Sequence, residues 1–260
     1  MYLEGFYTYL QFEKRYSKNT LEAYSKDISQ FQDFLIQEYQ SDDPELLRVN
    51  HRQVRAWVIH LMNNNVTPKS VNRKISALKT YYRFLLKNNA IAKNPMAKVV
   101  SPKIPKKLPL FVEKTGMEEL FDVLDQVYPV ETEVQRFVKQ RDRLIVELLY
   151  STGMRRAELL GLADNSFDRA QQQVKVLGKG NKERIIPVSK GLMLMADDYI
   201  AERKRIFGAG GPFIVTESGK PAYPKMIYNI VHQVLNHVTT LTRKSPHVLR
   251  HTFATHLSNN

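Results

Sequence analysis

The sequence predicts a mainly α-helical chain in two domains, with a small antiparallel β-sheet in the second. Three observations carry this prediction. Apolar residues recur at helical spacing before residue 94, four prolines interrupt residues 94–109, and residues 173–188 alternate in polarity around a glycine-rich turn. We therefore expect a helical domain over residues 1–93, a linker over residues 94–109 and a second domain over residues 110–260.

The first domain is expected to be helical throughout. Asn19 and Glu22 have the spacing of a capping box at a helix start. The helix that follows has its core stripe at Leu21, Tyr24, Ile28, Phe31 and Leu35. A third helix is expected over about Val49–Met62. A fourth begins with Thr67-Pro68, a cap followed by a proline at the first helical position, and continues to about Leu86.

The fourth helix has two faces of different chemistry. Its buried stripe consists of Val71, Ile75, Leu78, Tyr82 and Leu85. A second face carries, at steps of three and four, Lys69, Arg73, Ser76, Thr80 and Arg83. Such a face suits DNA phosphates or the major groove, although most basic helix faces are simply solvated. The candidate DNA contacts of this helix are Lys69, Arg73, Lys79 and Arg83.

The linker is basic as well as rich in proline. Prolines forbid a regular helix and favour an extended tether. Lys103, Lys106 and Lys107 add a basic run, and these three lysines join the candidate DNA contacts. A tether between two domains that grip one polyanion would have this composition, and so would an ordinary solvated linker.

The overall composition limits the kinds of binding partner and compartment that the protein can have. Lys and Arg number 39 against 26 Asp and Glu, which gives a net charge of +13. This excess is typical of proteins that bind polyanions, but it also occurs in basic proteins that are only kept soluble by their charge. The chain has no cysteine, which excludes disulfides and thiolate metal sites and favours a reducing compartment. No signal-peptide pattern or membrane-length apolar run is present, so we expect a cytoplasmic protein that does not bind membranes.

The second domain is predicted to combine helices with one hairpin. Helices are expected over residues 113–127, 141–150, 155–160, 192–207 and 225–241. Ser151–Met154 breaks the second of these. Residues 173–188 are expected to form a hairpin, because Gly178, Gly180 and Asn181 supply its turn chemistry. Phe213–Val215 is expected to be a short strand.

A last helix is predicted to begin at Pro246, with Ser245 as its N-cap. His247 and Arg250 are three residues apart, so both side chains can converge on one ligand. A helix N-terminus attracts anions, and no Asp or Glu occurs between Arg243 and Asn260. The expected ligand is therefore a phosphate.

Zinc is the competing interpretation of these histidines. His247 and His251 are four residues apart, a spacing that suits zinc on a helix. However, no carboxylate or cysteine lies nearby in the sequence, and Arg250 would repel a cation. We therefore predict neither a metal nor a cofactor.

Two further cationic residues also lie at junctions between elements. Arg155 follows the break at Ser151–Met154, and Lys179 lies at the predicted hairpin tip. Each is weak evidence alone, since a junction arginine usually forms a salt bridge and Gly-Lys-Gly-Asn is usually only a turn. Together with His247 and Arg250, their order and setting match one family.

The chain resembles the tyrosine site-specific recombinases, the phage-integrase and Xer-like group. Thr152–Leu162 resembles the box with the family's first catalytic arginine, Gly178–Pro187 its catalytic hairpin, and His247–Thr255 its His-x-x-Arg box. Ser17–Asp27 and Ser70–Leu78 resemble parts of its N-terminal domain. The resemblance implies a two-domain DNA clamp, which joins a helical SAM-like core-binding domain to an α+β catalytic domain.

The resemblance also implies a reaction without metal or cofactor. A tyrosine attacks a phosphodiester of double-stranded DNA, forms a 3′-phosphotyrosyl link and frees a 5′-hydroxyl, which rejoins in the reverse step. Arg155 and Arg250 would stabilise the charge of the transition state, while Lys179 would be the general acid and His247 would hold or relay a proton. From spacing alone, Glu158 lies three residues after Arg155, so it can share the same helix face and orient Arg155, or the two can form an ordinary surface ion pair worth little. The family assembles as a tetramer on short inverted-repeat sites.

The family's nucleophile is not found in this sequence. In the family, helices after the His-x-x-Arg box carry a second His or Trp and then the tyrosine. The chain has 13 tyrosines, and the last are Tyr223 and Tyr228, neither of which matches. We therefore expect a chain truncated by engineering or in nature, which binds DNA without cleaving it and is a monomer or weak oligomer.

The alternative is a non-catalytic DNA-binding regulator or competitor on the same fold. Resolution of chromosome dimers, integration and inversion remain open as roles.

Overall fold

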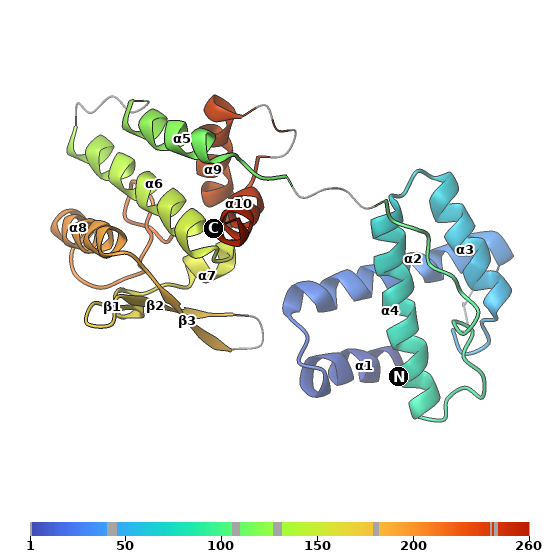
Figure 1. The fold of residues 1–260 in the computed structure, drawn as a ribbon. Helices are drawn as coiled ribbons and strands as arrows, with labels where there is room; N and C mark the ends of the chain where they lie inside the picture. Colours follow the sequence, from blue (N-terminus) through green and yellow to red (C-terminus); the bar gives the residue numbers. More distant parts are fainter. Residues whose placement is uncertain are drawn as a thin grey trace. The chain divides into compact units, whose positions relative to one another are not determined.

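The computed structural model describes residues 2–40, 46–105, 110–126, 132–178, 182–239, 241 and 244–259. The chain divides into two compact units, Met1–Lys107 and Leu108–Asn260 (Figure 1). The described residues are mostly helical, with one three-stranded antiparallel sheet in the second unit, so the predicted fold class is confirmed. None of the described helices is long and apolar enough to cross a membrane.

The first unit is a group of helices around one core. Its helices are α1 (Tyr2–Thr8), α2 (Lys18–Tyr39), α3 (His51–Asn63) and α4 (Pro68–Lys87), and a π-helical turn (Tyr9–Glu13) follows α1. All five residues of the predicted α4 stripe are buried. They pack with side chains from α2 and α3 that include Phe31 and Trp57.

The start of α2 differs from the prediction. Ser17 is the N-cap, and its hydroxyl accepts a hydrogen bond from the Thr20 amide. The capping box predicted at Asn19 and Glu22 is therefore wrong, because Asn19 is already helical and an N-cap residue must lie outside the helix. The predicted cap of α4 is correct, since the Thr67 hydroxyl accepts from the Ser70 amide at 3.3 Å.

Much of the expected linker packs against the first unit. Met96 is 2% exposed within that unit's core, and Val99 packs against the same core. The Asn72 side-chain amide on α4 donates to the Pro102 carbonyl at 2.9 Å. Prolines exclude a helix here but do not prevent apolar side chains from being buried, so the first part of residues 94–109 is anchored rather than a free tether.

The second unit is arranged around one central helix. Its helices are α5 (Lys114–Gln126), α6 (Glu133–Thr152), α7 (Arg156–Leu160), α8 (Lys190–Phe207), α9 (Pro224–Val238) and α10 (Pro246–Ser258). Helix α6 contacts α5 and α9 as well as α8, and α10 packs near its C-terminal end (Figure 1). It begins well before the predicted start at Arg141, because Thr132 and Gln135 form a capping box and Phe137 extends the buried stripe.

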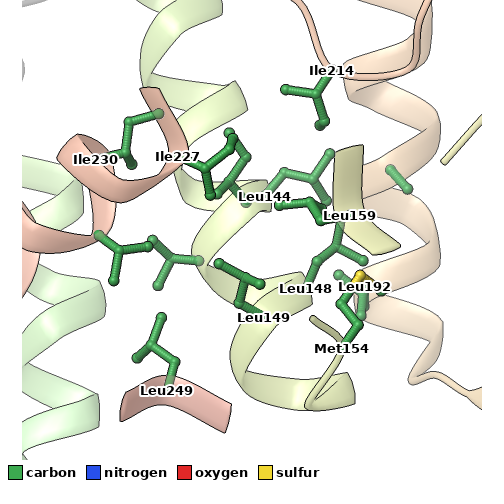
Figure 2. Packing of buried hydrophobic residues seen from close by; sticks show 14 of the residues in the cluster. Leu144, Leu148, Leu149, Met154, Leu159, Leu192, Ile214, Ile227, Ile230 and Leu249 are labelled. Carbon is green, nitrogen blue, oxygen red and sulfur yellow. The ribbon is translucent and has the colours of Figure 1, made fainter. Parts of the chain in front are cut away.

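Leucines and isoleucines from these elements form much of the hydrophobic core of the second unit. Leu144, Leu148 and Leu149 of α6 point among side chains of α9 and α10 and the segment before α7 (Figure 2). Each of these leucines is fully buried. Burial of such a side chain stabilises a fold by roughly 1.5–3 kcal/mol. This core fixes the ends of α6 and α10, which carry the candidate site.

The sheet consists of β1 (Phe167–Asp168), β2 (Gln173–Leu177) and β3 (Glu183–Pro187) in the order β1-β2-β3. The predicted β2–β3 hairpin is confirmed, with Val176 opposite Arg184 and Val174 opposite Ile186. The hairpin continues at Gly178, whose amide donates to the Lys182 carbonyl at 2.8 Å. Strand β1 was not predicted, because a strand of two residues is too short to show an alternation of polar and apolar residues.

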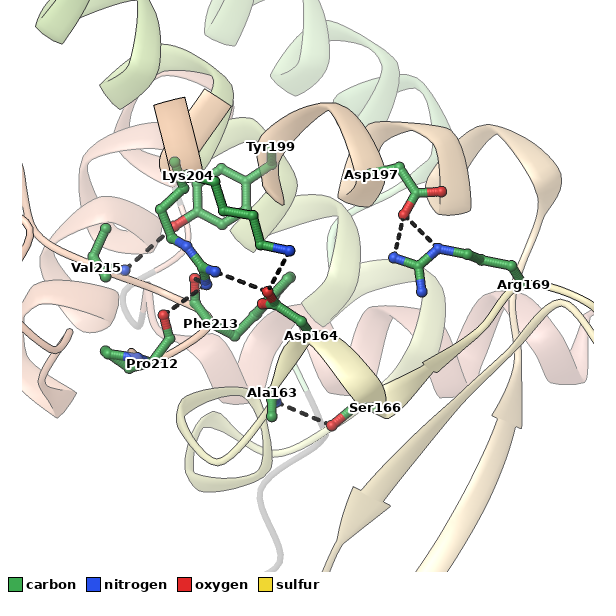
Figure 3. Close-up of polar contacts among 11 residues, drawn as sticks. Ala163, Asp164, Ser166, Arg169, Asp197, Tyr199, Lys204, Pro212, Phe213 and Val215 are labelled. Carbon is green, nitrogen blue, oxygen red and sulfur yellow. Dashed lines mark hydrogen bonds and ion pairs between the residues drawn. The ribbon is translucent and has the colours of Figure 1, made fainter. Parts of the chain in front are cut away.

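The strand predicted at Phe213–Val215 is wrong. This segment forms only an isolated bridge between Val215 and Pro221. Side chains and one loop amide supply most of its hydrogen-bond partners. Buried Arg203 donates to the carbonyls of Pro212 and Phe213, and the Ala222 amide donates to the Ile214 carbonyl. The Tyr199 hydroxyl accepts from the Val215 amide (Figure 3). The backbone groups are thus satisfied without a sheet, which an apolar run in the sequence does not reveal.

Candidate active site

The candidate site is built on the turn between α6 and α7. Helix α6 ends at Thr152, and Gly153 has a φ of +56°, a left-handed conformation that favours glycine. A Cβ at this position would also clash with the ring of Phe253 on α10. Glycine is therefore needed both for the turn and for the close approach of α10. After the turn, buried Met154 anchors the chain and Arg155 becomes the N-cap of α7.

Arg155 is held by Glu158 through two hydrogen bonds. The Arg155 amide donates to Glu158 Oε2 at 2.7 Å, and Arg155 Nη1 donates to Oε1 at 2.8 Å. Glu158 is only 3% exposed, whereas half of the Arg155 side chain is open to solvent. The carboxylate thus fixes the guanidinium and leaves part of it exposed, which is the relation predicted from their spacing.

The Glu158 carboxylate is favoured in its ionised form. Burial tends to raise its pKa, but the hydrogen bonds from Arg155 and the charges of Arg184 and Arg155 outweigh burial, and the pKa lies below its usual value. The carboxylate therefore remains an acceptor for both arginines at neutral pH.

Helix α10 brings Arg250 to the same turn. Arg250 Nη1 donates a hydrogen bond to the Gly153 carbonyl, 97 residues away in the sequence. Burial lowers the pKa of Arg250, and the charges of Arg155 and Arg184 lower it further. Guanidiniums that repel one another in this way form a region of positive potential that an anion would relieve.

The N-terminal end of α10 presents His247. Ser245 lies at the N-cap position and Pro246 follows it, as predicted, but the serine hydroxyl makes no capping hydrogen bond. Burial lowers the pKa of His247, and electrostatic interactions with four neighbours act in the same direction. These neighbours are the His251 ring and the guanidiniums of Arg156, Arg250 and Arg155. The site therefore favours the neutral form of His247, which is able to accept a proton.

Arg184 is a member of this cluster that the sequence analysis missed. It lies on β3, and its Nη2 donates to Glu158 Oε2 at 2.7 Å. A signal for it was present, since residues opposite each other in an antiparallel pair share a face and Arg184 lies opposite buried Val176. Alternation thus places an arginine on the core side of the hairpin, where a charge requires a partner.

Three of the predicted site residues lie outside the described residues: Lys179, Lys106 and Lys107. The part of the hairpin next to Lys179 in the sequence is described. A methyl group built on Gly178 would lie 3.5 Å from Glu158 Oε1, so the end of β2 approaches the carboxylate that holds Arg155.

Comparison with known proteins places the chain in a family. The model of the phage integrase family matches residues 112–260, and the model of the phage integrase N-terminal SAM-like domain matches residues 3–89. The chain belongs to the phage integrase family. It is a Xer-like tyrosine recombinase, and DNA strand exchange is the family's reaction.

Its relatives and structural neighbours are recombinases. Tyrosine recombinase XerC of Chlorobaculum tepidum is 35% identical over 278 residues, which cover 99% of this chain and 82% of the relative. XerC of Staphylococcus saprophyticus is 35% identical, covering 96% and 81%. The fold is similar to XerH recombinase bound to palindromic difH substrate, with a TM-score of 0.73, 18% identity and coverage of 91% and 68%. It is also similar to a lambda integrase dimer bound to a core site, with a TM-score of 0.68, 16% identity and coverage of 98% and 87%.

The predicted DNA contacts of the recombinase's first unit differ in their surroundings. Lys69, Arg83 and Lys103 are exposed, and Lys79 is half-buried. Arg73 is also open to solvent in part, but it pairs with the buried carboxylate of Asp27 on α2. The charge of Arg73 is therefore offset within the protein.

The remaining histidines of the last helix have different settings. His256 is buried, and its Nδ1 lies 3.0 Å from the Tyr150 hydroxyl on α6, so it packs α10 against α6. His251 is exposed. Within the described part of the chain, no group of three His, Cys, Asp or Glu side chains could hold a metal ion.

Proposed function

We propose that the second unit of this recombinase holds the scissile phosphate of double-stranded DNA between Arg155 and Arg250. One observation carries the proposal: the two guanidiniums belong to elements far apart in the unit's sequence and come together at the Gly153 turn. Their charges repel each other in the unliganded chain, and a phosphate offers each of them paired acceptors.

The chemistry assigned to the site follows from where charge develops. A phosphoryl transition state gathers negative charge on its non-bridging oxygens, and fixed guanidiniums stabilise that charge without reorganising. Arg155 meets this requirement because Glu158 holds both its amide and its side chain. Neutral His247 can take a proton near the phosphate. We assign the general acid for the leaving 5′-oxygen to Lys179, on the sequence alone.

The first unit would supply affinity for the DNA. Lys69, Arg83 and Lys103 are exposed cations suited to phosphate contacts, and such contacts are lost progressively as salt rises. With the linker lysines they would close a two-domain clamp on DNA. We further propose that the target is a short inverted repeat on which a tetramer forms, as the palindromic substrate of the structurally similar XerH supports.

The polypeptide of residues 1–260 should bind DNA without joining to it. No tyrosine of this sequence follows Arg250. Tyr223 and Tyr228, near the start of α9, are exposed but do not match the family's nucleophile. Incubation with a nicked duplex that traps covalent intermediates tests this, and a denaturation-resistant protein–DNA adduct would overturn it.

The phosphate site can be tested on DNA that the chain itself selects. Duplexes bound from a random pool are resynthesised with each phosphate replaced in turn by a neutral methylphosphonate. We expect one position per half-site at which neutralisation weakens binding by the parent chain but not by Arg155→Gln or Arg250→Gln. Arg205→Gln, which removes a cation paired on the surface between α6 and α8, serves as control. If the site variants bind all duplexes as the parent does, the site is wrong.

The same experiments address the alternative, a regulator that only binds DNA. Such a protein needs affinity from its basic surfaces but not a fixed pair of arginines around one phosphate. Uniform loss of binding at every neutralised phosphate, with no special position, would favour the regulator. The convergence of Arg155 and Arg250 favours the enzyme.

A further inference from the structure

We propose that Arg184 is a positioning residue that holds Arg155 through Glu158 and thereby ties the β2–β3 hairpin to the phosphate site. This inference rests on the proposed function, because it concerns how the proposed phosphate-binding arginine is held. Arg184 itself is given no contact with the phosphate.

The bridge is formed by one shared carboxylate oxygen. Glu158 Oε2 accepts from the Arg155 amide at 2.7 Å and from Arg184 Nη2 at 2.7 Å, while Oε1 accepts from Arg155 Nη1 at 2.8 Å. A carboxylate has about four lone-pair sites, so it can serve both arginines at once. Removal of Arg184 would leave the carboxylate held by Arg155 alone, so that both side chains would be less firmly fixed.

The position of Arg184 in the hairpin is poorly explained by stability alone. Its register partner Val176 is buried, and the next inward residue on β3 is Ile186, which packs against the core. An apolar residue would fit this face without an ionic partner, and such replacements are often neutral or stabilising. The Nε of Arg184 is buried without a hydrogen-bond partner in the described structure, so its ion pair with Glu158 is what orients the side chain.

Both sides of the hairpin lie next to the same carboxylate. Arg184 bonds to it from β3, and Gly178, the residue after β2, lies near enough that a Cβ built on it would be 3.5 Å from Oε1. Displacement of the hairpin therefore moves Glu158, and displacement of Glu158 moves Arg155.

A double-mutant cycle separates positioning from a direct contact. Sulfate is the probe, and its binding is followed by NMR through the amide signals of Gly153–Arg155. We expect Arg184→Gln and Glu158→Gln each to weaken sulfate binding about tenfold, and the double variant to be no weaker than Glu158→Gln. Additive losses would show that Arg184 acts as an independent cation, and an unchanged affinity in Arg184→Gln would also overturn the proposal.

Two further variants control for fold and charge. Arg205→Gln removes the same charge from the surface of α8 and should leave sulfate affinity unchanged. Arg184→Lys keeps the charge and can donate one bond to Glu158, so it should recover part of the affinity if the bridge matters. If Arg184→Lys binds sulfate no more tightly than Arg184→Gln does, the bridge is contradicted. Circular dichroism like that of the parent shows that both variants are folded.

A second measurement needs neither anion nor DNA. Titration of the Glu158 carboxyl, followed by carbon-13 NMR, should show a higher pKa in Arg184→Gln than in the parent, because one of the charges that lower it is lost. Arg205→Gln should not change it. If the parent fails to bind sulfate and DNA, the proposed function fails while this titration still decides the bridge. An unchanged titration in Arg184→Gln would refute the bridge by itself.

Discussion

Each unit of this recombinase contains a buried carboxylate that pairs with two cations, and the two clusters differ in how exposed and how free those cations are. Asp27 on α2 is 1% exposed and pairs with Arg73 and Lys74. Glu158 is 3% exposed and pairs with Arg155 and Arg184. The carboxylates are equally buried, so burial alone does not distinguish a structural cluster from a functional one.

The cations make the distinction. Both partners of Asp27 come from consecutive positions of one helix, and Lys74 is itself buried and bonded to Gln30 as well. That cluster joins α4 to α2 and buries the charge of Lys74, while the side chain of Arg73 is 44% exposed. The partners of Glu158 come from a helix junction and a hairpin, remain 50% and 38% exposed, and lie near the further cation of Arg250. That cluster fixes its cations while leaving charge available.

The largest effect on stability is expected at Asp27. Asp27→Asn leaves the ammonium of Lys74 buried without a counter-charge, which should destabilise the first unit by about 3 kcal/mol. The single tryptophan, Trp57, is buried in that unit's core, so its fluorescence during urea unfolding reports this unit. An unchanged Trp57 midpoint would mean that the Asp27 cluster is not structural.

Glu158 should show the opposite balance. Glu158→Gln leaves cations that water can reach, so the second unit should lose only about 1–2 kcal/mol, followed by circular dichroism with the Trp57 midpoint unchanged. The effect on phosphate recognition should be larger than this small loss of stability. Glu158→Gln should no longer show a DNA position at which a methylphosphonate weakens binding. A loss of stability as great as that of Asp27→Asn, with phosphate recognition intact, would reverse the comparison.

Two arginines that the sequence analysis assigned to one basic face of α4 sharpen the comparison within the first unit. Arg83 is exposed and forms no ion pair with any residue that the structure describes, whereas Arg73 is paired with Asp27. Arg83→Gln should weaken DNA binding and reduce by about one the slope of log K against log salt. Arg73→Gln should change the slope less and the Trp57 midpoint more. Equal slopes for the two variants would show that Asp27 does not offset the charge of Arg73.

Sequence patterns predicted what depends on neighbours in the chain. The buried stripe of α4, its Thr67 cap and the relation between Arg155 and Glu158 all follow from spacings of three and four residues. The meeting of Arg250 with the Gly153 carbonyl joins residues 97 apart, and no local pattern contains it. Only the family resemblance assigned the segments around Arg155 and Arg250 to one site, because periodicity describes single elements.

Other features were missed because their partners could not be read from the sequence. The apolar run Phe213–Val215 has the composition of a strand, but the side chains of Arg203 and Tyr199 and the amide of Ala222 are its hydrogen-bond partners, and no neighbouring strand is present in the described structure. The alternation of β3 predicts that Arg184 points inward. Its role nevertheless depends on pairing with Glu158, 26 residues earlier in the sequence, which alternation does not predict. Pairing between distant polar groups is decided by packing, and hydrophobic periodicity does not encode it.

His247 offers the smallest and most specific test, because its titration should move stability and anion affinity in opposite directions. Its pKa in the folded chain lies below the ordinary value of 6.5, because of burial and then its cationic neighbours. The unfolded chain therefore binds the proton more readily, and the His247 contribution to stability is present above pH 6.5 and lost as the pH falls through that value and below. His247→Gln should flatten this part of the pH dependence of the second unit's unfolding, measured by circular dichroism without phosphate.

Sulfate binding should follow the reverse course. Protonated His247 adds a charge beside Arg250, so affinity for sulfate, whose own charge is constant over this range, should rise as the pH falls. The bound anion should in turn raise the pKa of His247, which the ring carbon signals report. His237→Gln, an exposed substitution in the last turn of α9, is the matched control and should keep both trends. If the parent's sulfate affinity is flat from pH 7 to pH 5, His247 does not face the anion, and the site reduces to its arginines.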